Sequence, residues 1–183
     1  GEGFTSPNPM VGAVIVHNDR IIGEGYHRHY GAPHAEVNAI RSVKDESLLT
    51  ESTMYVSLEP CSHYGKTPPC ADLIIQKKIP HVVIATPDPN PLVSGNGILK
   101  MKQAGIDVTV GMMEKEAKEQ NRVFFINQLC NRPYIILKWA QSKDGFIDHQ
   151  RTSLLENAPA KISNELTHTI VHKFRTRVQG IMV

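Results

Sequence analysis

Apolar runs rich in β-branched residues alternate with segments of helical periodicity through residues 1–130, and this alternation limits the possible folds more than any other feature. The predicted strands cover residues 11–16, 20–26, 53–58, 81–86 and 107–110. The predicted helices cover residues 33–43, 71–78, 98–104 and 114–130. Asn18 and Asp19 predict a turn that joins the first two strands into a hairpin. Strands that are separated by helices pair in parallel, so we expect an α/β fold with a largely parallel sheet after the hairpin.

The pattern restarts after residue 130, where Asn131, Arg132 and Pro133 interrupt it. A strand over 134–140, a helix over 163–175 and a strand over 178–183 are predicted beyond this point. We therefore predict one domain over residues 1–130 and a second over 131–183. The second has only about 50 residues, which is at the low edge for an independent core, so we expect it to be truncated. The chain begins without Met, and an N-terminal helix of the first domain is expected to be missing.

The composition excludes several classes of protein. Lys and Arg total 20 against 18 Asp and Glu, and this small net charge of +2 gives no reason to expect nucleic acid or membrane partners. No apolar run approaches the roughly 18 residues of a membrane-spanning helix. Three cysteines are too few for a secreted disulfide scaffold, so a reducing, cytoplasmic location is predicted.

Three side chains offer donors for one metal ion: His34, Cys61 and Cys70. His34 opens a predicted helix, Cys61 follows a predicted strand, and Cys70 precedes the next helix, whose N-terminus favours a thiolate. Strand ends and helix starts meet at one edge of an α/β sheet, so these residues can converge there. Two thiolates and a neutral imidazole balance Zn²⁺, and three protein ligands leave the fourth position open, as in catalytic zinc sites.

Glu36 lies two residues after His34 and is predicted to be the catalytic proton carrier. Residues i and i+2 diverge within a helix, but in the first turn both side chains can lean toward the open end. Simpler explanations exist, because a lone His-x-Glu is common and the two cysteines could be unrelated thiols or a disulfide. A zinc-stabilised binding module without catalysis is a further alternative, which would need four protein ligands and no Glu36.

The combination of His34-Ala35-Glu36 with Pro60-Cys61 and Cys70 resembles the signature of zinc nucleobase deaminases. That signature has two residues between the cysteines, whereas eight separate them here. With this longer spacing, the chain resembles the riboflavin-biosynthesis bifunctional deaminase/reductase family. The resemblance is carried by residues 59–70 (EPCSHYGKTPPC), 6–14 (SPNPMVGAV), 88–93 (DPNPLV) and 95–98 (GNGI).

The resemblance implies a cytidine-deaminase-like, three-layer α/β/α fold with a mixed sheet. It also implies hydrolytic deamination of 2,5-diamino-6-ribosylamino-4(3H)-pyrimidinone 5′-phosphate, a small pyrimidine ribotide. His34, Cys61 and Cys70 would hold Zn²⁺, and Glu36 would move protons. The substrate-binding residues implied by the matching motifs are Asn8, His27, His63, Lys66, Thr67, Asp88 and Asn90. Deaminases of tRNA adenosine, deoxycytidylate or guanine are alternatives that the cysteine spacing disfavours.

Several of these residues also have simpler explanations. Lys66 and Thr67 offer a cation and a hydroxyl to a phosphate, but Lys66 could be a solvated surface charge. Asn8 lies between prolines and could only form a turn, and His27 and His63 could be surface histidines. The pair of glycines in residues 95–97 is a weak phosphate signal, and a loop that enters a helix explains it equally well.

Residues 134–145 are similar to the opening of the family's reductase, whose fold is like that of dihydrofolate reductase. The resemblance implies NADPH as a second cofactor of a full-length protein. Lys143 and Phe146 depart from the family's usual form, and no cofactor-binding residue is assigned. We expect that residues 131–183 cannot reduce the sugar by themselves. The apolar helix that ends at residue 130 offers an interface for a homo-oligomer.

Overall fold

The structure is a computed structural model that describes residues 1–64, 68–90, 93–150 and 158–182. It divides into two compact units, Gly1–Tyr134 and Ile135–Val183. Among the described residues, no helix is both long enough and apolar enough to cross a membrane. The first unit holds every residue that the sequence proposes for the deaminase site.

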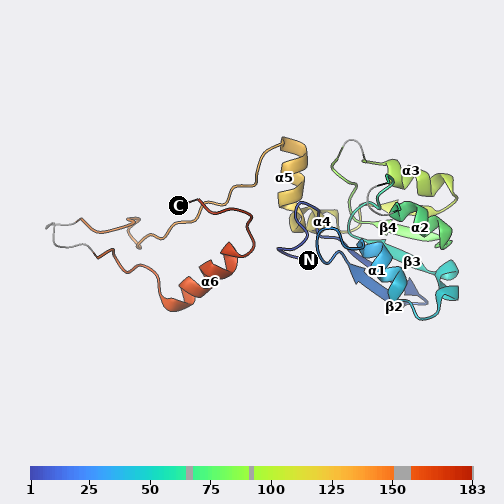
Figure 1. Cartoon of the computed structure of the whole chain (residues 1–183), viewed down its shortest axis with the longest axis horizontal. Coiled ribbons are helices and arrows are strands. Elements are labelled where there is room, and N and C mark those ends of the chain that lie inside the picture. The colour runs from blue at the N-terminus through green and yellow to red at the C-terminus, as the bar shows by residue number, and fades with distance from the viewer. Residues whose placement is uncertain (65–67, 91–92, 151–157, 183) are drawn as a thin grey trace. The chain divides into compact units, whose positions relative to one another are not determined.

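A five-stranded sheet forms the centre of the first unit (Figure 1). Its strands are β1 (Gly12–His17), β2 (Arg20–Tyr26), β3 (Thr53–Val56), β4 (His81–Ile84) and β5 (Asp107–Val110), in the spatial order β2-β1-β3-β4-β5. Strand β1 pairs antiparallel with both β2 and β3, whereas β3, β4 and β5 are parallel. The predicted hairpin is confirmed, and the parallel pairing is confined to β3–β5, so the sheet is mixed.

Helices and a 3₁₀ turn lie between the strands and after the last one. They are α1 (Ala35–Ser42), a 3₁₀ turn (Glu46–Glu51), α2 (Cys70–Gln76), α3 (Asn96–Gln103), α4 (Glu114–Gln120) and α5 (Arg122–Cys130). Alternate strand residues such as Ile15, Met54 and Ile84 are fully buried and pack against residues such as Ala39 of α1 and Ile74 of α2. This period of two is what a sheet with one buried face requires. The predicted α/β architecture is confirmed.

The predicted helix over 114–130 differs from the structure, which has two helices that meet at Asn121. The side chain of Asn121 is buried, accepts the N–H of Met10 at 2.8 Å and donates to the Met10 carbonyl at 2.8 Å. Asn121 leaves helical geometry, with φ −106° and ψ 21°. A contact between residues 111 positions apart therefore overrides the local helical pattern.

Helix α1 packs unusually close to β2 because β2 contains glycines. A Cβ atom on Gly25 would lie 2.3 Å from the Ala39 nitrogen and 2.7 Å from the Ala35 carbonyl oxygen. Both atoms belong to the backbone of α1, so neither can move without shifting the helix that carries His34 and Glu36. The close approach thus couples the packing of the sheet to the position of the site.

Replacing Gly25 with Ala is expected to lower the free energy of unfolding by about 1–3 kcal/mol, because the new methyl group overpacks the interface between α1 and β2. Denaturant titration of both proteins would measure the difference. Gly12→Ala in β1 is the matched control, since nothing lies within 4 Å of its added Cβ, and its effect should stay within about 0.5 kcal/mol. Equal stability of the two variants would contradict the close packing.

The second unit contains one helix among its described residues, α6 (Glu165–Arg175), which confirms the helix predicted over 163–175. The Asn164 side chain caps it by accepting the N–H of Thr167 at 2.9 Å. The predicted strands over 134–140 and 178–183 are wrong for the residues described, which form neither strand. A strand needs a neighbour for its backbone, and Leu137 and Trp139 are instead 78% and 63% exposed.

Candidate active site

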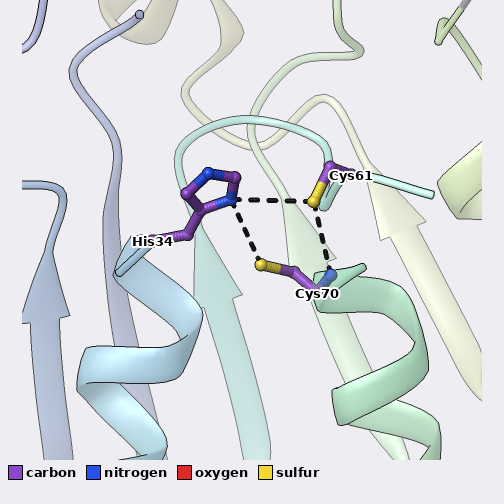
Figure 2. A group of neighbouring side chains, drawn as sticks. All are labelled: His34, Cys61 and Cys70. Atoms are coloured by element: carbon purple, nitrogen blue, oxygen red, sulfur yellow. Dashed lines mark hydrogen bonds between the residues drawn. The ribbon is translucent and has the colours of Figure 1, made fainter. Parts of the chain in front are cut away.

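The loop before α1, the loop between β3 and α2, and the first residue of α2 bring His34, Cys61 and Cys70 together (Figure 2). His34 is the residue before α1, and its Nδ1 lies 3.6 Å from the Cys61 Sγ and 3.4 Å from the Cys70 Sγ. Cys70 is the first residue of α2, and its N–H donates to the Cys61 Sγ at 3.3 Å. Both cysteines are free thiols, so the alternative of a disulfide is excluded.

The geometry of these three donors fits a tetrahedral zinc ion. Zn–S bonds of about 2.3 Å and Zn–N bonds of about 2.0–2.1 Å, at tetrahedral angles, place nitrogen and sulfur about 3.5 Å apart. The two observed N–S distances are 3.4 and 3.6 Å, and all three donor atoms lie within 4.8 Å of one another. No fourth His, Cys, Asp or Glu among the described residues joins this group, which matches a catalytic rather than a structural zinc site.

The thiols influence each other's protonation. A hydrogen bond from Cys70 and a weaker one from His34 lower the pKa of Cys61 to about 4, although burial of the thiol acts in the opposite direction. The hydrogen bond that the Cys70 thiol makes with Cys61, followed by burial, raises the pKa of Cys70. The hydrogen bond to Cys61 also raises the pKa of His34. A divalent cation would stabilise both thiolates, since metal binding displaces the protons that they now share.

Glu36 lies in the first turn of α1, and its side chain is buried with 3% of its surface exposed. It lines the same cavity as His34 and Cys61. Burial is the main cause that raises the pKa of Glu36 to about 7. The expectation that His34 and Glu36 can face one site from the first helical turn therefore agrees with the observed geometry.

A cavity of about 510 Å³ opens beside the three metal-binding candidates. It is large enough for a small-molecule ligand. The predicted residues that line it are Asn8, His27, His34, Glu36, Cys61, His63, Asp88 and Asn90. Lys66 and Thr67, which are predicted to contact a phosphate, lie outside the described residues.

His27 is buried rather than a surface histidine, with 3% of its surface exposed. Its Nδ1 donates to the Pro33 carbonyl at 3.2 Å, which leaves Nε2 to accept the side-chain N–H of Asn8 at 3.3 Å. Burial lowers the pKa of His27, which favours this neutral form. The His27 ring also meets the His34 ring edge-on, with 5.4 Å between ring centres. Asn8 and His27 thus form one wall of the cavity, next to the metal-binding candidates.

Asp88 and Asn90 follow β4 and form another wall of the cavity. The Asn90 N–H donates to the Asp88 Oδ1 at 2.8 Å, so the Asp88 side chain closes a turn over its own loop. Burial raises the pKa of Asp88. His63 also lines the cavity, but it is exposed and therefore lies toward its opening.

Sequence reasoning missed two groups of residues at this site. Phe124 and Gln128 of α5 line the cavity. The break at Asn121 sets the direction in which α5 begins. Glu59 is buried with 4% exposed, and its carboxylate binds the loop that carries Asp88. The glycine spacing at residues 95–97 was the available signal for Glu59, because backbone N–H groups at a helix start bind an anion. Here that anion is a side chain of the same protein.

Comparison with known proteins agrees with this site. The family model for the cytidine and deoxycytidylate deaminase zinc-binding region matches residues 2–86. Zinc is accordingly the metal that the family binds, and the donor geometry described above fits it. The match also confirms the predicted cytidine-deaminase-like fold, in which helices flank a mixed sheet.

Full-length relatives extend the comparison beyond the zinc-binding region. The chain is 44% identical over 182 residues to the riboflavin biosynthesis protein RibD of Aquifex aeolicus, covering 100% of this chain and 49% of that protein. A crystal structure of a diaminohydroxyphosphoribosylaminopyrimidine deaminase/5-amino-6-(5-phosphoribosylamino)uracil reductase from Thermotoga maritima is similar, with a TM-score of 0.83 and 45% identity. The match covers 96% of this chain and 48% of the Thermotoga maritima chain. This chain therefore spans about half the length of the bifunctional relatives that it matches.

A shorter relative covers the deaminase region alone. It is the diaminohydroxyphosphoribosylamino-pyrimidine deaminase of Buchnera aphidicola, 52% identical over 125 residues, which cover 68% of this chain and 84% of that protein. The identity therefore extends over most of a protein that is named for this one activity. The identity to these relatives, together with the geometry of the zinc site, shows that the chain belongs to the RibD family of diaminohydroxyphosphoribosylaminopyrimidine deaminases.

Proposed function

We propose that this chain catalyses the hydrolytic deamination of 2,5-diamino-6-ribosylamino-4(3H)-pyrimidinone 5′-phosphate in riboflavin biosynthesis. One observation carries the proposal: the buried carboxyl group of Glu36 shares a cavity with His34 and Cys61, whose donor atoms are spaced for zinc. Water replaces the 2-amino group as a carbonyl oxygen, and ammonia leaves. The activity named for the Buchnera relative supports this choice of substrate.

Each residue of the site has a proposed task. His34, Cys61 and Cys70 hold zinc, which acts as a Lewis acid that makes water a better nucleophile near neutral pH. Glu36 accepts a proton from the attacking water and returns it to the departing amine. Asn8 and His27 line the pyrimidine and ribose pocket, and Asp88 and Asn90 complete it.

Three further residues complete the proposed site. His63 contacts the substrate at the opening of the cavity. Lys66 and Thr67 bind the ribose phosphate, as their position between the two cysteines of the motif suggests. The finer predictions of a homo-oligomer and of a cytoplasmic location stay predictions.

We also propose that residues 131–183 are the first part of an NADPH-dependent reductase domain, after a deaminase domain over residues 1–130. The deaminase/reductase of Thermotoga maritima supports this proposal, because its match covers 96% of this chain and so extends into that segment. The sugar reduction would belong to a longer protein. A chain of residues 1–183 is expected to release ammonia without oxidising NADPH.

An assay of ammonia release from the diaminopyrimidine ribotide, with zinc content measured on the same sample, tests the deaminase proposal. Cytidine, deoxycytidylate, guanine and tRNA are the comparison substrates. Release from the ribotide alone supports the proposal. Faster release from deoxycytidylate or tRNA would point to another deaminase, and zinc binding without any release would favour a non-catalytic zinc module.

A further inference from the structure

Among the described residues, Glu59 is a buried acidic side chain to which the proposed chemistry gives no task. It follows β3, two residues before Cys61, and its own N–H donates to the Thr86 carbonyl at 3.0 Å. Only 4% of its surface is exposed. A carboxylate is costly to bury unless every oxygen is hydrogen-bonded, so the hydrogen-bond partners of Glu59 explain how its charge can be buried.

The two carboxylate oxygens of Glu59 accept four backbone N–H groups. Oε2 accepts from Asp88 at 3.2 Å and from Gly95 at 2.9 Å. Oε1 accepts from Gly97 at 2.9 Å and from Ile98 at 3.3 Å. The donors lie at both ends of the connection between β4 and α3, and the last two open α3, where the helix dipole also favours an anion. A single side chain therefore holds the two ends of this connection.

The start of α3 is shaped to accept this carboxylate. Gly95 has φ +80°, a conformation that glycine adopts readily, and it turns its N–H toward Glu59. A Cβ atom on Gly97 would lie 2.1 Å from the Pro60 carbonyl oxygen and 3.3 Å from the Glu59 Oε1. Only glycine lets the backbone of α3 come this close to the segment that leads to Cys61.

We propose that Glu59 is a positioning residue: its carboxylate holds the connection between β4 and α3 so that Asp88 and Asn90 face the cavity beside Cys61. Glu59 lines the cavity, but both of its carboxylate oxygens already accept backbone N–H groups, so it acts through these groups rather than on the substrate. It links the loop that carries a metal-binding candidate to the wall that carries two substrate-binding candidates. The expected effect on substrate binding rests on the proposed function, whereas the effect on the loop geometry does not.

Replacing Glu59 with Gln tests the proposal. The amide keeps one accepting oxygen and turns its NH₂ group toward two backbone donors, so two hydrogen bonds are lost whichever way the amide points. We expect KM for the diaminopyrimidine ribotide to rise at least about tenfold, while kcat changes less than about threefold, because the loss concerns uniform binding rather than proton transfer. Zinc content should not change. Glu51→Gln is the matched control, since Glu51 is exposed at the end of the 3₁₀ turn.

Hydrogen exchange of the zinc-loaded chain gives a second readout that needs no substrate. In the unsubstituted chain the amide of Gly97 should exchange slowly, and in Glu59→Gln the amides of Gly95, Gly97 and Ile98 should exchange faster. Gly97→Ala pushes the start of α3 away from Pro60 and Glu59 without altering the carboxylate. It should raise both KM and the exchange rates of these amides. Hydrogen exchange does not depend on turnover, so it tests the role of Glu59 in the loop even if the ribotide proves not to be the substrate.

Three outcomes would overturn the proposal. Rapid exchange of the Gly97 amide in the unsubstituted chain would show that the carboxylate does not hold α3, even if neither variant folds. Faster exchange in Glu59→Gln with an unchanged KM would show that the loop does not position substrate groups. Loss of zinc from Glu59→Gln would show that Glu59 acts through Cys61 instead.

Discussion

Replacing Glu36 with Gln is expected to lower kcat for ammonia release by about 10²- to 10⁴-fold, the usual contribution of a positioned proton carrier. Gln has nearly the same shape, but it cannot accept the proton of the attacking water and return it to the amine. The side chain is buried and contributes no donor atom to the group of His34, Cys61 and Cys70, so zinc content should not change. Steady-state assays and metal analysis of the purified variant would measure both quantities.

Stability provides the control for this prediction. A neutral amide is easier to bury than a carboxylate, so Glu36→Gln should unfold at the same denaturant concentration as the unsubstituted chain, or at a higher one. The exposed Glu116 offers a matched Glu→Gln substitution that should alter neither rate nor stability. Retained turnover in Glu36→Gln would remove Glu36 from the mechanism, and release of zinc would make it a ligand.

Replacing Cys61 with Ser is expected to abolish both stoichiometric zinc binding and detectable turnover. The hydroxyl of Ser does not ionise near neutral pH, so the site loses one of the two thiolates that balance the charge of the metal. The loss should also destabilise the chain, because a ligand present at a thousandfold excess over its Kd contributes about 4 kcal/mol to the free energy of unfolding. Metal analysis after dialysis and denaturant titration with and without added zinc would measure these effects.

Cys130→Ser is the matched control for the same chemical change. Cys130 is an exposed thiol at the end of α5 and is not part of the three-residue group. It should keep its zinc, its turnover and its stability. A Cys61→Ser protein that retains stoichiometric zinc after dialysis, or a Cys130→Ser protein that loses it, would contradict the assigned ligand set.

The differences between sequence and structure have particular physical causes. Residues 114–130 have helical periodicity throughout, yet the helix breaks where Asn121 exchanges two hydrogen bonds with Met10. Residues 134–140 have the composition of a strand, but a strand exists only when a neighbour pairs with its backbone, and none of the residues described here does so. His27 was predicted to bind substrate, but a surface position stayed an alternative because the sequence does not reveal which side chains cover it.

The amino-acid sequence by itself determined the alternation of strands and helices and the hairpin, and it proposed His34, Glu36, Cys61 and Cys70 as members of one zinc-dependent site. Periodicity, turn chemistry and donor type depend on neighbouring residues, so they can be identified without coordinates. Only the tertiary structure decided that Glu59 binds Gly97 and Ile98 at the start of α3, which are 38 and 39 positions away. It alone also decided that Asn121 binds Met10, two residues after Asn8. Such contacts depend on how the sheet brings distant loops to one edge, which no local pattern specifies.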